Sequence, residues 1–153
     1  MKTLELKIPP PPLAAGFGVL MWAIDRWLPM HADRSWVRNV IALVTFGLAV
    51  AIVVTAVISF RRARTTLDPF HPEKASSVVT SGIYAVTRNP MYLGFLLTLL
   101  AFAVFLDNFA SAVLPLIFVV YMNRLQIGPE ERALRARFGA SYEVYLRSVR
   151  RWI

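Results

Sequence analysis

Residues 87–94, with the sequence TRNPMYLG, place an arginine, an asparagine, a proline and a tyrosine at the start of a long apolar run. Pro90 suits the first turn of a helix, where its missing N–H is not needed. The free backbone N–H groups of that turn, together with the cation of Arg88, would suit an anionic or polar ligand. The structural alternative is a helix start at a membrane interface, with Arg88 reaching lipid phosphates and Tyr92 in the aromatic belt.

A second polar cluster lies in the sequence GPEERALRARFG at residues 128–139. Gly128 and Pro129 favour a helix start, which places Glu130 and Glu131 in the first helical turn. Carboxylates are stabilised there by the helix dipole, and this alone is a structural explanation for both residues. The functional alternative is that they bind a cationic group of a ligand.

The sequence offers little for a metal site. It contains no cysteine and only two histidines, His31 and His71, which are too far apart in the chain to suggest a shared site. We therefore predict no metal centre. His71 is interpreted as a loop residue between two prolines that could line a site.

The composition is that of a membrane protein. Hydrophobic residues make up 57% of the 153 residues, and the mean hydropathy is +0.54. Residues 40–60 carry no charge over a length that crosses a bilayer. The net charge of +8 is concentrated at the ends of apolar runs, which favours membrane lipids over nucleic acid as partners.

The apolar runs predict a single all-α membrane domain with about four transmembrane helices, at residues 13–28, 40–60, 91–106 and 109–125. The prolines at residues 9–12 are expected to form a stiff lead-in before the first helix. Asp25 and Arg26 interrupt the end of the first run, and we interpret them as a structural pair near the outer interface.

Only Asp107 and Asn108 separate the last two runs, which predicts a tight helical hairpin. A hairpin returns its two ends to the same face of the membrane. The cluster around Arg88 would therefore lie near the Glu130–Glu131 pair and near Arg124, which by itself would be an interfacial anchor.

All lysines and arginines except Arg26, Arg34 and Arg38 lie on one side of a four-helix arrangement. This asymmetry predicts that both termini are cytoplasmic. A loop at residues 61–89 and a basic, amphipathic helical tail at residues 128–151 would then lie on that side. Gly139 is expected to end the first tail helix and Ser141 to cap the second.

Two segments resemble a known family, the integral-membrane methyltransferases that include isoprenylcysteine carboxyl methyltransferase and the phospholipid N-methyltransferases. They are SGIYAVTRNPMYLG at residues 81–94 and EERALRARFGASYEVYLRSVRRW at residues 130–152. The family signature is an Arg-His-Pro-x-Tyr motif, a helical hairpin, and a Glu-Glu pair before a Phe-Gly and a tyrosine-rich tail. Asn89 stands where the motif has histidine, as in many bacterial relatives.

The resemblance implies a cytoplasmic site for S-adenosylmethionine and a location in the bacterial inner membrane. Arg88 or the helix start at Pro90 would bind the carboxylate of this cofactor, and Glu130 or Glu131 its ammonium group. Tyrosines could face the sulfonium or the adenine. The cofactor-binding set is therefore Gly82, Tyr84, Arg88, Asn89, Pro90, Tyr92, Glu130 and Glu131, with Tyr142 and Tyr145 as further aromatic candidates.

For the reaction itself, we expect Arg124 to orient the acceptor, and Glu131 to fix the cofactor or remove a proton, with Glu130 able to take either role. The acceptor is expected to be a lipophilic small molecule or a lipid that enters from the bilayer. Methyl transfer is an in-line displacement, so alignment and exclusion of water are the main tasks of the protein.

Two other functions remain open from the sequence. Sterol reductases resemble the same hairpin and motif, which would make NADPH the cofactor. A non-enzymatic membrane scaffold would use the motif residues as interfacial anchors only. A soluble Rossmann-type methyltransferase is excluded, because the sequence has no glycine-rich loop between a strand and a helix.

Overall fold

The computed structural model describes residues 5–30, 35–63 and 77–153. Throughout these residues the regular structure is helical, as the sequence predicts. His31 and His71, as well as residues 64–76 of the predicted loop at residues 61–89, lie outside the described residues. The positions of these residues therefore stay predictions.

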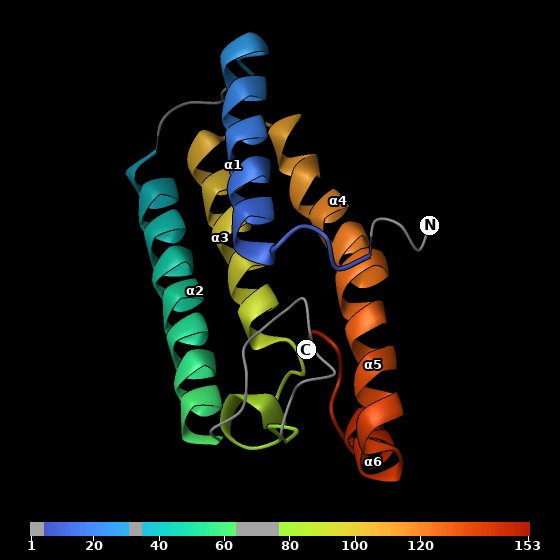
Figure 1. The fold of residues 1–153 in the computed structure, drawn as a ribbon. Helices are drawn as coiled ribbons and strands as arrows, with labels where there is room; N and C mark the ends of the chain where they lie inside the picture. The colour runs from blue at the N-terminus through green and yellow to red at the C-terminus, as the bar shows by residue number, and fades with distance from the viewer. Residues whose placement is uncertain (1–4, 31–34, 64–76) are drawn as a thin grey trace.

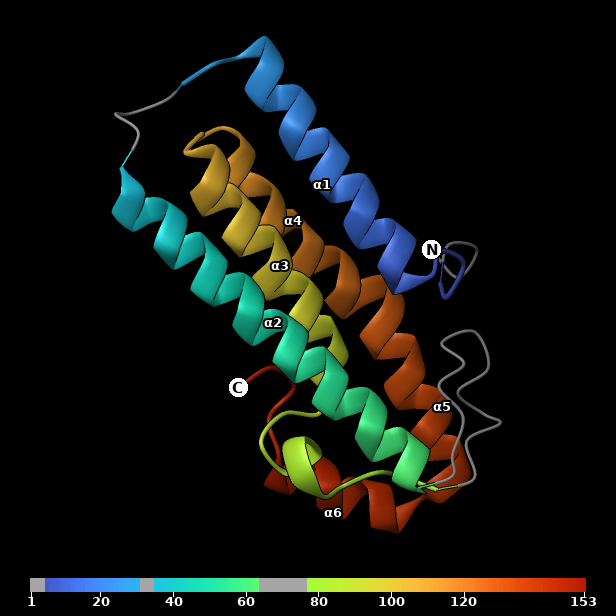
Figure 2. The ribbon, with the colours of Figure 1, turned by 90° about the vertical axis from the view of Figure 1, so that its left-hand side faces the viewer.

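The fold is a bundle of long helices with a smaller helical layer at one end (Figure 1). The long helices are α1 (Pro10–Trp27), α2 (Trp36–Ala63), α3 (Pro90–Leu106) and a fourth that begins with the short helix η3 (Ser111–Val113) and continues as α4 (Leu114–Tyr121). Helix α3 is central, with α2 on one side and α1 and α4 on the other (Figure 2). Both ends of the hairpin formed by α3 and α4 can therefore reach the same end of the bundle.

Helix α1 begins earlier than the sequence predicts. Pro9 is its N-cap and Pro10 its first residue, so Pro10, Pro11 and Pro12 belong to the first helical turn and not to a lead-in. The expectation was wrong because N–H groups in the first turn have no intrahelical acceptor, so consecutive prolines there cost no hydrogen bond.

Helices α2 and α3 pack closely through small residues. Ala42, Ala49 and Ala56 recur every seven residues on α2, and all three are buried. Gly94 on α3 faces this stripe: a Cβ atom added there would lie 2.3 Å from Val53 Cγ2 and 3.1 Å from the carbonyl oxygen of Ala49. Gly94, two residues after the RNPMY sequence, is thus required by the contact between the two helices.

The hairpin turn between α3 and α4 is tied to the other helices by polar side chains. Asp107 ends α3 in a left-handed conformation, with φ of 55°, and its carboxylate accepts a hydrogen bond from Arg38 at the start of α2. Asn108 is buried, and its side-chain amide donates to the carbonyl of Leu28 at the end of α1 at 2.7 Å. Residues 107–108 therefore fix the far end of the bundle as well as reversing the chain.

Two helical segments are long and apolar enough to cross a membrane, Trp36–Ala63 and Ser111–Phe138. Helix α3 is apolar but shorter. Many large apolar side chains on α2 are exposed, including Leu43, Val44 and Phe46, as expected of a surface that faces lipid. The count of four spans stays a prediction.

The fourth long helix runs without interruption from Ser111 to Phe138. Helix α4 passes into a π-helical turn, η4 (Met122–Ile127), and then into α5 (Gly128–Phe138). Helix α5 begins at the predicted glycine, although it continues directly from the preceding turn.

The last helix, α6 (Ala140–Ser148), forms the smaller layer at the end of the bundle. Gly139 ends α5 as predicted, and its φ of 54° explains the glycine there. The predicted cap by Ser141 is wrong, because its hydroxyl donates back to the carbonyl of Phe138 at 2.8 Å. Gly139 instead occupies the N-cap position of α6.

Candidate active site at the end of the helical hairpin

The start of α3 is held against the C-terminal segment. Pro90 is its first residue and is buried, and Asn89 is its N-cap. The side-chain amide of Asn89 donates a hydrogen bond to the carbonyl of Arg151 at 2.9 Å, and the Thr87 hydroxyl donates to the same carbonyl at 3.3 Å. The asparagine that replaces the histidine of the motif therefore fastens the chain terminus to this helix start.

Arg88 points into the protein. Only 13% of its side chain is exposed. Its Nη2 atom lies 3.2 Å from Oε1 of Glu131, and its Nη1 atom donates to the carbonyl of Leu146 at 3.1 Å. Its Nε atom is buried and has no hydrogen-bond partner among the described residues. An arginine that reaches lipid phosphates would be exposed at its tip, so this geometry is that of an internal cation whose Nε–H is left without a partner among the described residues.

Glu131 lies between two guanidinium groups. Arg151 contacts it with two nitrogens, Nε to Oε1 at 3.1 Å and Nη2 to Oε2 at 2.6 Å, while Arg88 approaches Oε1. The residue is only 8% exposed. Its buried negative charge is therefore compensated by Arg88, just before α3, and by Arg151 in the C-terminal segment.

Glu130, the neighbouring carboxylate, has different partners. Its Oε1 atom accepts hydrogen bonds from the Tyr92 hydroxyl and from the side-chain amide of Gln126, both at 2.5 Å. These two donors are neutral, so they orient the carboxyl group without forming an ion pair with it. The adjacent glutamates of the sequence thus differ in electrostatic character.

The π-helical turn supplies two of the polar side chains around these glutamates. Gln126 is buried and contacts Glu130. The Asn123 carbonyl oxygen Oδ1 accepts hydrogen bonds from Arg151 Nη1 and from the Trp152 indole nitrogen, each at 3.2 Å. A π-helical turn changes which residues face a given direction, and such turns are frequent at functional sites.

Sequence reasoning missed four residues that surround the glutamates: Asn123, Gln126, Arg151 and Trp152. A signal for the first two was available, because amides are costly within an apolar helix unless they have partners or a function. Arg151 and Trp152 gave no such signal, since a basic and aromatic chain terminus is ordinary at a membrane surface.

The short helix η2 (Gly82–Ala85) lies in the loop before α3 and packs this loop against other helices. Gly82 starts it with φ of 63°, a conformation that favours glycine. Tyr84 is buried, its ring packs edge-on against Phe60 at 5.3 Å between centroids, and its carbonyl accepts a hydrogen bond from the Tyr145 hydroxyl at 2.7 Å. Gly82 and Tyr84 thus link the loop to α2 and α6.

The tyrosines of this layer remain neutral donors at ordinary pH. Burial raises the pKa of Tyr145 to about 12. Burial also raises the pKa of Tyr84, with further increases from Tyr145 and Glu130, and that of Tyr142, with a further increase from Glu131.

The structure therefore brings together Arg88, Asn89, Tyr92, Glu130 and Glu131. Pro90 starts α3, which carries Tyr92 and follows Arg88 and Asn89 directly. Gly82 and Tyr84 lie in the loop before α3. Arg124, the residue predicted to orient the acceptor, lies on the π-helical turn, and its side chain is exposed. The roles of all these residues stay predictions.

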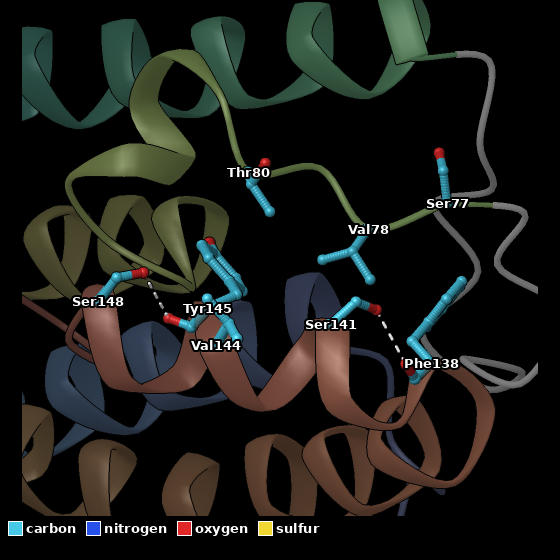
Figure 3. A pocket seen from close by; sticks show the side chains of 8 residues that line it. All are labelled: Ser77, Val78, Thr80, Phe138, Ser141, Val144, Tyr145 and Ser148. Atoms are coloured by element: carbon cyan, nitrogen blue, oxygen red, sulfur yellow. Dashed lines mark hydrogen bonds between the residues drawn. The ribbon is translucent and has the colours of Figure 1, made fainter.

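An open groove of about 600 Å³ lies between residues 77–80 and α6 (Figure 3). Its wall on α6 includes Ser141, Val144, Tyr145 and Ser148. The described residues that line it carry no charge, which suits an apolar or aromatic group better than a carboxylate. Tyr145 lines this groove, and its hydroxyl also donates a hydrogen bond to the carbonyl of Tyr84 in the loop before α3.

Comparison with known proteins identifies related sequences. The chain is 29% identical over 137 residues to the probable protein-S-isoprenylcysteine O-methyltransferase of Oryza sativa subsp. indica, covering 90% of this chain and 72% of the relative. It is 32% identical over 128 residues to protein-S-isoprenylcysteine O-methyltransferase B of Arabidopsis thaliana, covering 80% of this chain and 62% of the relative. No solved structure matches the chain.

The sequence model of the phospholipid methyltransferase family matches residues 37–141, which include the hairpin and both glutamates. With the isoprenylcysteine methyltransferase relatives, this match indicates a methyltransferase of the isoprenylcysteine or phospholipid type. The apolar helices agree with a membrane protein of that kind. The chain therefore belongs to the phospholipid methyltransferase family.

Proposed function

We propose that this protein transfers a methyl group from S-adenosylmethionine to a lipophilic acceptor at the cytoplasmic face of the membrane. The cofactor site consists of Arg88 and the start of α3, together with Glu130 and the charged partners of Arg88. The acceptor is an isoprenylcysteine-like carboxylate, a lipid headgroup or another hydrophobic small molecule.

The observation that carries this proposal is the free donor of Arg88 beside Glu130 and Glu131. A buried guanidinium with an unsatisfied Nε–H is costly, and a ligand carboxylate would satisfy it. Glu130 accepts its described hydrogen bonds from neutral donors, so a cationic ligand group would be its charge partner. An anionic and a cationic acceptor site side by side fit the amino-acid portion of S-adenosylmethionine.

The two glutamates take different roles in this proposal. Glu131 is already compensated by Arg88 and Arg151, so it holds Arg88 in place. Glu130 is the charge partner of the ligand. When bound, S-adenosylmethionine supplies a methyl group on a positively charged sulfur, and the protein aligns the acceptor with it and keeps water out.

Arg124 is the candidate residue on the acceptor side. It is exposed on the π-helical turn, whereas Asn123 of the same turn contacts the C-terminal segment. A lipophilic acceptor that arrives from the bilayer would meet the outer surface of this helix first. An exposed guanidinium there would orient an anionic acceptor atom.

The orientation with both termini in the cytoplasm, in a bacterial inner membrane, is part of the proposal. Arg26 near the end of α1 and Arg38 near the start of α2 lie at the end of the bundle opposite α6. Arg61 and Arg62 close α2 at the other end, near α6. This distribution agrees with the positive-inside rule.

The test is calorimetric titration of the detergent-purified protein with S-adenosylmethionine and, in parallel, with NADPH. We expect saturable binding of S-adenosylmethionine only, and a loss of at least tenfold in affinity for Arg88→Ala. Arg147→Ala, an exposed arginine on α6, is the matched control and is expected to bind as the wild type does.

Other outcomes would replace the proposal. Binding of NADPH instead would indicate a reductase of the sterol-reductase type. Binding of neither cofactor by a protein that is folded by circular dichroism would favour a scaffold. If Arg88→Ala binds S-adenosylmethionine as tightly as the wild type, the site lies elsewhere.

A further inference from the structure

Arg151 contacts three separate parts of the site with one side chain and one carbonyl group. Its guanidinium contacts Glu131 on α5 and Asn123 on the π-helical turn. Its carbonyl accepts hydrogen bonds from Asn89 and Thr87 just before α3. Arg151 is therefore the point at which both ends of the hairpin meet the C-terminal segment.

The neighbours of Arg151 fix its backbone. The N–H group of Arg88 donates to the carbonyl of Arg150 at 3.0 Å. The Trp152 indole donates to Asn123, and its ring packs against the main hydrophobic core that includes Phe118 and Met122. The guanidinium of Arg151 is therefore presented to Glu131 from a backbone that is held on both sides.

The pairing pattern at Glu131 explains why Arg88 keeps a free donor. Arg151 occupies Oε2 fully, at 2.6 Å from its Nη2, and shares Oε1 with Arg88. Arg88 is left with a single contact to Glu131, through Nη2 at 3.2 Å. A guanidinium and a carboxylate otherwise prefer a two-pronged contact, which would engage Nε together with one Nη atom.

We infer that Arg151 is a positioning residue: by occupying Glu131, it prevents Glu131 from capturing the Nε–H of Arg88 and keeps that donor available for an anionic ligand group. This inference rests on the proposed function, because it assigns the ligand carboxylate to Arg88. Arg151 itself touches no ligand in this arrangement and acts through Glu131.

The consequence of removing Arg151 is specific. In Arg151→Ala, both oxygens of the buried Glu131 become available to Arg88, which turns to form the two-pronged contact and loses its spare donor. Affinity for S-adenosylmethionine is then expected to fall at least tenfold. Arg151→Lys keeps a positive charge near Oε2 of Glu131 but cannot form the two-pronged contact. Its affinity for S-adenosylmethionine should therefore lie between those of the wild type and Arg151→Ala.

The decisive variant is the double substitution Glu131→Gln with Arg151→Ala. A neutral glutamine does not form the two-pronged contact with the guanidinium of Arg88 that a carboxylate forms. The Nε–H of Arg88 is then again available to an anionic ligand group. The double variant is therefore expected to bind S-adenosylmethionine more tightly than Arg151→Ala alone. A residue that merely stabilised the fold would show the opposite, since a second substitution would add to the damage.

The experiment measures the affinity for S-adenosylmethionine calorimetrically for the wild type, Arg151→Ala, Arg151→Lys, the double variant and the control Arg147→Ala, each checked for helicity and thermal unfolding. Recovery in the double variant supports the inference. Wild-type affinity in Arg151→Ala, or weaker binding in the double variant than in Arg151→Ala, overturns the inference and leaves the proposed function intact. Absence of binding by the folded wild type would overturn both.

Discussion

Arg88 and Glu131 form an ion pair, with 3.2 Å between Nη2 and Oε1, that joins the residue before α3 to the first turn of α5. The pair is nearly enclosed, with 13% and 10% of the two side chains exposed. It links the two ends of the helical hairpin on one side of the bundle. The contrast between this compensated glutamate and its neighbour Glu130 leads to the first prediction.

Glu130→Gln should weaken binding of S-adenosylmethionine at least tenfold while leaving the fold intact. The amide keeps an oxygen that can accept from Tyr92, but it removes the negative charge that would pair with a cationic ligand group. Calorimetric titration measures the affinity. Glu143→Gln is the matched control, because Glu143 is half-exposed in an ion pair with Arg135 on the outer surface. Equal affinities for the two variants would contradict the role of Glu130.

Gly94→Ala should destabilise the bundle by about 1–3 kcal/mol, as overpacking of a close contact does. The added methyl group would overlap Val53 and approach the Ala49 carbonyl of α2. Gly47→Ala on α2 meets open space and should be neutral or slightly stabilising. Reversible unfolding in mixed micelles compares the free energies of unfolding, and a neutral Gly94→Ala would show that α2 and α3 are less tightly packed than described.

Asn108→Ala should lower the free energy of unfolding by about 1–3 kcal/mol without changing the affinity for S-adenosylmethionine. The substitution removes the donor to the Leu28 carbonyl and the acceptor for the Ser111 N–H at the far end of the bundle. Unfolding and titration of the same preparation separate the two effects. A tenfold loss of affinity would mean that the two ends of the hairpin are coupled.

Alkaline pH should destabilise the layer formed by η2 and α6. Burial raises the pKa of Tyr145 to about 12 from its ordinary value near 10. Between these values the folded state holds a proton that the unfolded state has lost. The stabilisation due to Tyr145 is therefore fully present below about pH 10 and falls as the pH rises through this window. The midpoint of thermal unfolding, measured from pH 8 to pH 11, should fall less steeply in Tyr145→Phe. An identical slope in both proteins would contradict this assignment.

The elements that the sequence determined by itself are those that depend on near neighbours. Hydropathy indicated the helices, the Asp107–Asn108 break indicated the hairpin, and Gly139 indicated the end of α5. The RNPMY and Glu-Glu segments were sufficient for the family, which the family model confirms. Local sequence failed at Pro10–Pro12 and at Ser141, where the position of the residue relative to the helix start decides its effect.

Only the tertiary structure decided which charges meet. The sequence could not distinguish Glu130 from Glu131, because their difference comes from Tyr92 on α3 and Arg151 at the chain terminus. Nor could it assign Asn123, whose direction is set by a π-helical turn. The physical reason is that an ion pair or hydrogen bond depends on atoms being about 3 Å apart, and that distance is fixed by how distant segments pack.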